Sequence, residues 1–140
     1  MKNKRKIGKI AAILAIVFVA ICGMQLLLGY WLLPGQIQRV EFRGFDSCEA
    51  PATQKVALNI DEIRKFTTLY CCSFYAGQVN AQGCPSDFGF DIYLTDGRHI
   101  IIREAGGSRL EVTTSHGQHW IKSSRLAAYA QELMETYNLA

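Results

Sequence analysis

The feature that most constrains this chain is a long stretch without a charged side chain, which extends from Lys9 to Arg39. Within it, Ile10–Leu33 is a run of 24 residues in which Gln25 is the only strongly polar side chain. As a helix this run spans about 36 Å at about 1.5 Å per residue, enough to cross a hydrocarbon core of about 30 Å. The run therefore predicts a transmembrane helix, which we place at residues 10–35.

The flanks of this run indicate how the helix is oriented. Residues 1–9 form a basic tail, and residues 1–35 hold five Lys or Arg and no acid. Because cytoplasmic flanks are enriched in Lys and Arg, we expect the tail in the cytoplasm and residues 36–140 outside the membrane. The apolar run is longer than the roughly 7 to 15 residues of a signal-peptide core, and no clean A-x-A site follows it. We therefore expect a retained single-pass anchor in the cell membrane.

The charge of the outer part excludes one class of partner. Residues 36–140 hold ten Lys or Arg and twelve Asp or Glu, so this part is close to −2, and the +3 of the whole chain comes from the tail. Nucleic-acid binding needs a basic patch on the folded domain. The sequence gives no sign of one, so we expect the membrane as a partner and no nucleic acid.

Periodicity in the outer part predicts two helices and four strands. Residues 37–45 alternate as a half-buried strand does, and Leu110 and Val112 alternate with polar residues in the same way. One helix is expected from Asn59 to about Cys72, with a capping box between Asn59 and Glu62. A second helix begins at Ser123 or Ser124. We expect residues 74–87 to be a long irregular connection and residues 116–122 to be a loop or short strand.

Residues 88–104 are the clearest hairpin, with Asp96-Gly97 between two apolar runs. A three-residue loop, Thr95 to Gly97, pairs Ile92 with Ile100 and Phe90 with Ile102, whereas a two-residue turn does not place apolar residues on one face. We therefore predict the longer loop, with Gly97 in the left-handed conformation.

These elements predict an α+β fold. After the transmembrane helix, the order is β-α-β-β-β-α, with an antiparallel sheet covered on one face by two helices. A strand leaving the membrane, a capped helix at Asn59–Leu69, the hairpin Ile92–Ile100 and a closing helix resemble small, functionally uncharacterised membrane-anchored or lipoprotein-type extracytoplasmic domains of Gram-positive bacteria. The resemblance covers roughly residues 37–138 and implies no activity, cofactor or site residue.

Four cysteines follow the apolar run, an even number in a compartment that permits disulfides. Adjacent Cys71 and Cys72 are poorly placed to bond with each other, so we expect Cys48 to pair with one of them and Cys84 with the other. A redox-active thiol is the less favoured alternative, because cysteines late in a helix lack the N-terminal dipole that lowers a thiol pKa.

Three histidines, His99, His116 and His119, are weak candidates for a metal site, because zinc needs three or four convergent ligands. Polar loop histidines are the simpler interpretation. The acids are scattered singly, and neither a catalytic motif nor a cofactor motif is present. Three aromatic residues, Trp120, Tyr93 and Tyr129, either line a recognition surface or belong to the core, the commoner role.

Three hypotheses of function remain. The first is a non-enzymatic extracytoplasmic module that binds a protein, peptide or envelope component through the sheet face without helices. The second is a metal- or thiol-dependent enzyme or sensor that uses the histidines or the outer cysteines. The third is an accessory subunit of a membrane complex, in which the apolar helix with Gln25 makes the contact.

Overall fold

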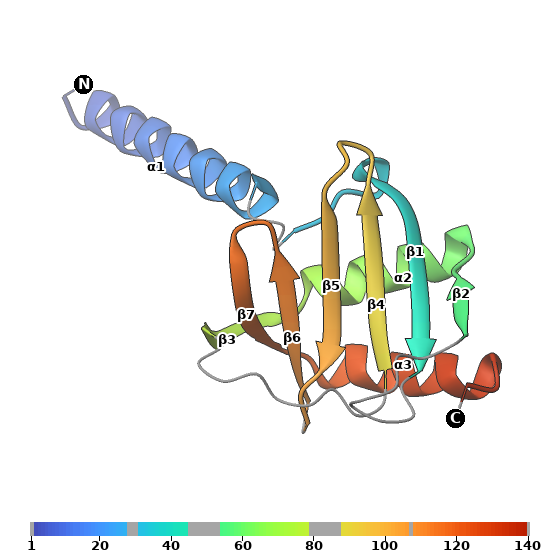
Figure 1. Cartoon of the computed structure of the whole chain (residues 1–140). Helices are drawn as coiled ribbons and strands as arrows, with labels where there is room; N and C mark the ends of the chain where they lie inside the picture. The colour runs from blue at the N-terminus through green and yellow to red at the C-terminus, as the bar shows by residue number, and fades with distance from the viewer. Residues whose placement is uncertain (1, 28–30, 45–53, 79–87, 107, 140) are drawn as a thin grey trace. The chain divides into compact units, whose positions relative to one another are not determined.

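The first element is a long helix, α1 (Lys2–Leu27), which contains most of the uncharged run. An 18-residue window within Lys2–Gln25 has a mean hydropathy of 2.5, so the helix is long and apolar enough, by length and composition, to cross a membrane. Figure 1 shows α1 in the computed structural model of the chain, which describes residues 2–27, 31–44, 54–78, 88–106 and 108–139. The helix differs from the predicted residues 10–35 at both ends, and at its start the basic tail is itself helical.

At its C-terminal end, the predicted transmembrane helix was too long. Pro34–Gln36 forms a short 3₁₀ helix, η1, and does not continue α1. Leu32 is only 3% exposed because it belongs to the hydrophobic core of the folded domain. The chain divides into two compact units, residues 1–31 and residues 32–140. The apolar run Ile10–Leu33 therefore contributes residues to both units. Its part in α1, Ile10 to Leu27, is about 27 Å long at about 1.5 Å per residue.

The second unit is built on a seven-stranded sheet with the order β2-β1-β4-β5-β6-β7-β3. Every neighbouring pair of strands is antiparallel. The strands are β1 (Ile37–Gly44), β2 (Lys55–Ala57), β3 (Phe74–Gln78), β4 (Phe88–Leu94), β5 (His99–Glu104), β6 (Arg109–Thr114) and β7 (Gly117–Lys122).

The predicted α+β class is confirmed, but the sheet has more strands than the predicted order contains. The prediction of an irregular connection over residues 74–87 was wrong for Phe74–Gln78, which form the edge strand β3, while residues 79–87 lie outside the described part. This strand is short, includes Gly77 at a register shift, and pairs with β7, which begins only at Gly117. Its pairing partner therefore gives no local signal in the sequence.

The predicted register of the β4–β5 hairpin is confirmed. Ile92 lies opposite Ile100, and Phe90 lies opposite Ile102, as the three-residue loop requires. Gly97 has a φ of 87°, in the region that favours glycine. The apolar side chains of the hairpin therefore share one face.

Helix α2 (Ile60–Cys71) begins with the predicted capping box. The backbone amide of Glu62 donates to the Asn59 side chain at 2.9 Å, and the Asn59 amide donates to the Glu62 carboxylate at 2.9 Å. Helix α3 (Ser124–Thr136) begins at one of the two predicted positions and is capped by Ser123. These contacts satisfy backbone donors that the first turn of a helix leaves unpaired.

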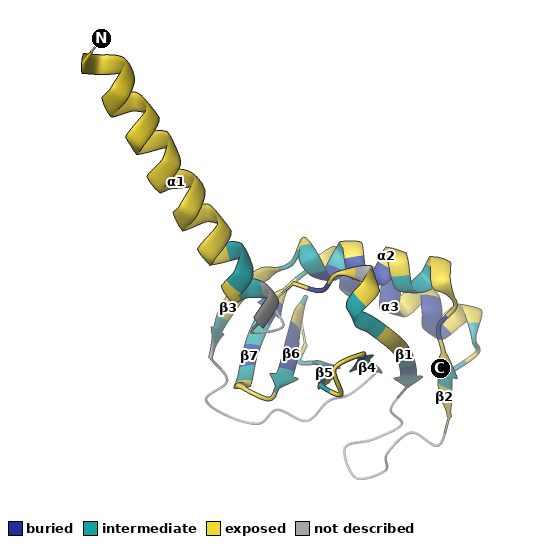
Figure 2. Ribbon diagram, turned by 90° about the horizontal axis from the view of Figure 1, so that it is seen from above, coloured by how far each residue is buried: buried dark blue, intermediate teal, exposed yellow. Residues whose placement is uncertain are grey.

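Both helices lie on the same side of the sheet (Figures 1 and 2). They are joined to each other by an ion pair between Lys65 and Glu132 at 2.9 Å, and by the Tyr137 hydroxyl, which donates to Glu62 at 2.6 Å. The residues that face the helices alternate along each strand and are buried. They include Val40, Phe42, Phe90, Ile92, Ile100, Ile102, Leu110, Val112 and Ile121.

Candidate binding face

Neither α2 nor α3 lies on the opposite side of the sheet, and we call this side the helix-free face. Its positions are the strand residues that alternate with the buried core positions. They hold six Lys or Arg and three Asp or Glu, a formal excess of three positive charges. These nine residues are Arg39, Glu41, Arg43, Lys55, Asp91, Arg103, Arg109, Glu111 and Lys122.

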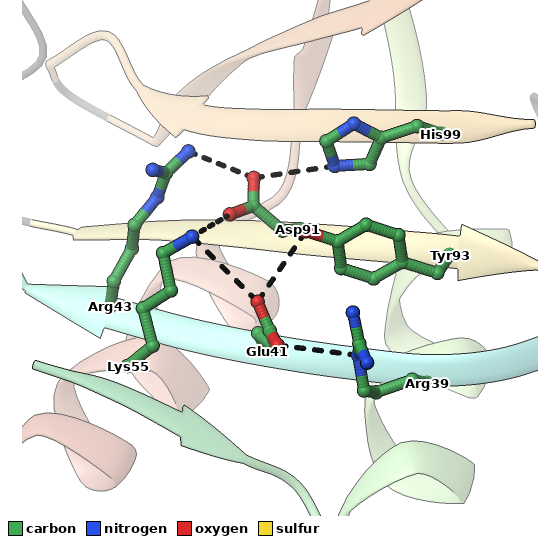
Figure 3. A network of polar contacts seen from close by, with 7 residues as sticks. All are labelled: Arg39, Glu41, Arg43, Lys55, Asp91, Tyr93 and His99. Carbon is green, nitrogen blue, oxygen red and sulfur yellow. Dashed lines mark hydrogen bonds and ion pairs between the residues drawn. The ribbon is translucent and has the colours of Figure 1, made fainter.

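Asp91 is the centre of a polar network on this face (Figure 3). Asp91 is on the side of the sheet that faces away from the hydrophobic core, yet its side chain is only 2% exposed. The Arg43 guanidinium contacts its carboxylate at 2.8 Å, the His99 imidazole Nε2 lies at 3.6 Å and the Lys55 ammonium at 3.9 Å. Three side chains from three strands therefore converge on one buried carboxylate.

Tyr93 extends the network toward the end of the sheet where η1 enters the domain. The His99 imidazole stacks on its ring at a centroid distance of 4.5 Å and an interplanar angle of 7°. The Arg39 guanidinium lies 4.3 Å from the same ring centroid, a cation–π contact. Glu41 joins the two groups, at 3.2 Å from Arg39 and 3.5 Å from the Tyr93 hydroxyl. Contacts within this face thus hold the charged and aromatic side chains together.

The other half of the helix-free face contains Arg103, Glu111 and Trp120, which lie opposite one another on β5, β6 and β7. Glu111 is buried, at 8% exposed. The Arg109 guanidinium lies 5.7 Å from the centre of the Trp120 ring. The Nε atom of Arg103 is buried and has no hydrogen-bond acceptor among the described residues. This half therefore presents cationic and aromatic groups with fewer internal contacts.

The structure separates the three candidate metal ligands. His99 lies on the helix-free face, whereas His119 alternates with Ile121 on the helix-covered face, and His116 lies in the exposed turn between β6 and β7. Side chains on opposite faces of a sheet cannot converge on one ion. In the described ranges no group of three metal-binding side chains comes together. These weak candidates therefore do not form a common site, and the simpler interpretation as polar loop histidines was wrong for His99 and His119, which lie on strands.

His119 is packed inside the domain as a structural residue. It is 5% exposed, and the Tyr75 ring stacks on it at 5.9 Å. Burial disfavours the charged imidazole and lowers the pKa of His119 to about 4. The side chain is therefore held neutral inside the domain at physiological pH.

The expected disulfides to Cys71 and Cys72 do not appear, since both carry free thiols in the structure. Cys48 and Cys84 lie outside the described residues. Cys71 is half-buried, and its thiol donates to the backbone carbonyl of Leu32 at 3.5 Å. Cys71 therefore lies beside Leu32, where the chain enters the folded domain. Burial raises the pKa of the Cys71 thiol, the opposite of what a reactive thiolate needs.

The three aromatic candidates divide between two roles. Tyr129 is buried in the core and its hydroxyl donates to the carbonyl of Glu62 at 3.3 Å. Tyr93 and Trp120 lie on the helix-free face instead. The core role therefore applies to Tyr129, and Tyr93 and Trp120 are outside the core.

Comparison of the chain with models of known families, with curated proteins and with solved structures gave no match.

Sequence reasoning missed the positive charge of the helix-free face. A count over the whole outer part gives a slightly acidic domain, because the acids lie mainly elsewhere. The signal was present in alternate strand positions, such as Arg39 and Arg43 on β1 or Arg109 on β6. It becomes a continuous surface only when the strand order is known.

Proposed function

We propose that this chain is a single-pass membrane protein that displays a binding module at the outer surface of the cell membrane. Helix α1 is the anchor, the basic tail lies in the cytoplasm, and the helix-free face binds a protein, peptide or envelope component without catalysing a reaction. The observation that carries the proposal is the network around Asp91, which fixes charged and aromatic side chains on the face that the helices leave uncovered.

The anchor is supported by length and by charge. Lys2 to Lys9 supply five cations at one end of α1, and the helix beyond them has no charged side chain. Such asymmetry orients a helix with its basic end in the cytoplasm. In this orientation the domain begins a few residues beyond the bilayer, at Leu32. A partner would therefore be met close to the membrane surface.

The binding role is supported by the free-energy cost of burying the charged network around Asp91. Taking charges out of water is expensive, and a buried ion pair often contributes less stability than apolar side chains of the same volume. A sheet face that only had to remain soluble needs no carboxylate that is 2% exposed. Groups held rigidly before binding lose less conformational entropy when a partner arrives. Recognition explains this arrangement better than stability does.

The test is site-specific cross-linking with the full chain in the membranes of cells that naturally make it. A photoreactive phenylalanine derivative replaces Ile101, in the middle of the helix-free face, and in a matched control it replaces Ala128, which is exposed on α3. We expect a discrete adduct from position 101 and none from position 128. No adduct from position 101, or the same adduct from both positions, would contradict the proposal.

A further inference from the structure

Three large apolar side chains are exposed near the point where the chain enters the folded domain. Phe74 is 76% exposed, Tyr75 is 58% exposed and Leu33 is 52% exposed. We call these three residues the apolar edge group. Among the described residues from Leu32 onward, the one other exposed large apolar side chain is Ile60, at 60%. Single exposed apolar residues are normal, whereas a local group of them indicates a contact surface.

The end of α2 brings the apolar edge group together. The Cys71 thiol contacts the carbonyl of Leu32 at 3.5 Å, so the last residue of α2 lies beside the residue that precedes Leu33. Phe74 follows Cys71 by three residues, so their Cα atoms are within about 11 Å of each other. Ile60 begins α2 and lies about 16 Å away along the helix axis. It therefore does not belong to the group.

Two members of the group lie on β3, at the edge of the described sheet, where this strand pairs with β7 alone. Phe74 lies opposite Lys122 and Tyr75 lies opposite Ile121, so the two aromatic side chains are on different faces of the sheet. Because β3 is an edge strand, both can meet a surface that lies along it. Lys122 and its neighbour Arg109 are exposed, and they place two cations beside Phe74.

The covalent link to α1 keeps this part of the domain close to the bilayer. Helix α1 ends at Leu27 and the domain begins at Leu32, so at most about 18 Å of extended chain connects them. The apolar part of α1 is about 27 Å long, slightly less than a hydrocarbon core of about 30 Å. In a membrane, the residues that follow α1 are therefore at the hydrocarbon boundary, and the domain begins at the level of the headgroups.

We propose that the apolar edge group contacts the bilayer that α1 crosses, with Lys122 and Arg109 facing anionic lipid headgroups. The inference rests on the anchor of the proposed function and adds a lipid contact to it. Tyr is enriched at the boundary between hydrocarbon and water, and Phe and Leu insert there as interfacial anchors. Lys and Arg beside a membrane are attracted to anionic lipids. The group therefore has the composition of an interfacial contact.

A strand from a second copy of the chain is the other occupant that a sheet edge can take. Strand β3 has only five residues, and its register shifts between Tyr75 and Gly77. Short and bulged edge strands are poor templates for pairing with another chain. The bilayer, in contrast, is always present at this end of the domain. Lipid is therefore the occupant that the structure favours.

The test uses a fluorine probe in the full chain, placed in nanodiscs of phosphatidylcholine and phosphatidylglycerol. Trifluoromethyl-phenylalanine replaces the exposed Phe74, and in a matched control it replaces the exposed Ile60. Some nanodiscs also contain a lipid with a doxyl radical near the headgroup end of one acyl chain, which broadens the NMR signals of nearby fluorine atoms. We expect the radical to broaden the signal at position 74 strongly and the signal at position 60 little.

A second arm tests the cations. In nanodiscs of phosphatidylcholine alone, the broadening at position 74 should be weaker, because Lys122 and Arg109 then have no anionic lipid to attract. Equal broadening with and without phosphatidylglycerol would contradict their part in the contact.

The inference is overturned if the radical leaves the signal at position 74 unchanged, or if it broadens the signal at position 60 as strongly. A signal at position 74 that ignores the radical but shifts as the chain is concentrated in nonionic detergent would assign β3 to a second copy. If the chain enters the nanodiscs and either result is found, the lipid contact alone fails. A chain that does not enter the nanodiscs would contradict the anchor of the proposed function as well.

Discussion

Asp91 is the residue on which the order of the helix-free face depends most. Its carboxylate is nearly inaccessible, and it is contacted by Arg43, Lys55 and His99. Removing one partner of a buried charge pair leaves the other charge desolvated and uncompensated. An exposed pair loses little, because water already screens it.

Replacing Asp91 by Ala should therefore destabilise the domain by about 3 kcal/mol. The matched control is Asp61→Ala, since Asp61 pairs with Arg64 on the exposed surface of α2 at 3.8 Å, and it should cost less than about 0.5 kcal/mol. Chemical unfolding of the full chain in detergent measures both. Equal losses for the two variants would show that the Asp91 network is not buried as described.

His119 should make the stability of the domain depend on pH. Its pKa is lowered to about 4 in the folded protein, whereas in the unfolded chain a histidine has a pKa of about 6.5. Between these values the unfolded chain binds the proton more readily, so acidification favours unfolding. The stability that neutral His119 contributes is present above pH 6.5 and is lost as the pH falls toward 4.

His119→Leu should remove a loss of about 2 to 3 kcal/mol between pH 7 and pH 4. His116→Leu should keep the natural pH dependence, because it changes an exposed turn residue and leaves the buried His119 in place. Thermal unfolding at a series of pH values distinguishes them. If both variants lose stability in parallel with the natural chain, the assignment of the effect to His119 is wrong.

At the scale of elements, the parts that the sequence predicted correctly are those set by short-range rules. The capping box needs only Asn59 and Glu62, three residues apart. The hairpin register needs only the apolar pattern around Asp96-Gly97. Strand β3 was missed because its pairing with β7 depends on the arrangement of the whole sheet. Local patterns carry no information about such a partner.

Gly97 offers a test of the hairpin. Its φ of 87° is strained for any residue with a Cβ, although a Cβ there would meet no atom within 4 Å. Gly97→Ala should therefore cost about 1 kcal/mol through backbone strain alone, and Gly97→Asn should cost less. Gly35→Ala is the control, since Gly35 also faces open space but its φ lies outside the left-handed region. Unfolding midpoints that do not differ between the two alanine variants would contradict the bulged turn.

At the scale of the whole molecule, the sequence indicated the division into an apolar helix and an α+β domain, but not how charge is distributed over the folded surface. The positive helix-free face arises because residues far apart in the chain, such as Arg39 and Arg109, reach the same side of one sheet. The same reasoning applies to the weak metal candidates His99 and His119, which the sheet places on opposite faces. Topology, and not composition, decides which side chains act together.

We propose that α1 holds the domain at the outer surface of the membrane. This topology can be tested by placing an epitope tag before Met1 or after Ala140 and probing intact and permeabilised cells with an antibody, after confirming that the chain resists extraction by alkaline carbonate. We predict that the C-terminal tag is accessible on intact cells, that the N-terminal tag is accessible only after permeabilisation, and that the mass of the chain is unchanged. A chain released by carbonate, trimmed near the end of α1, or labelled in the reverse orientation would contradict the account.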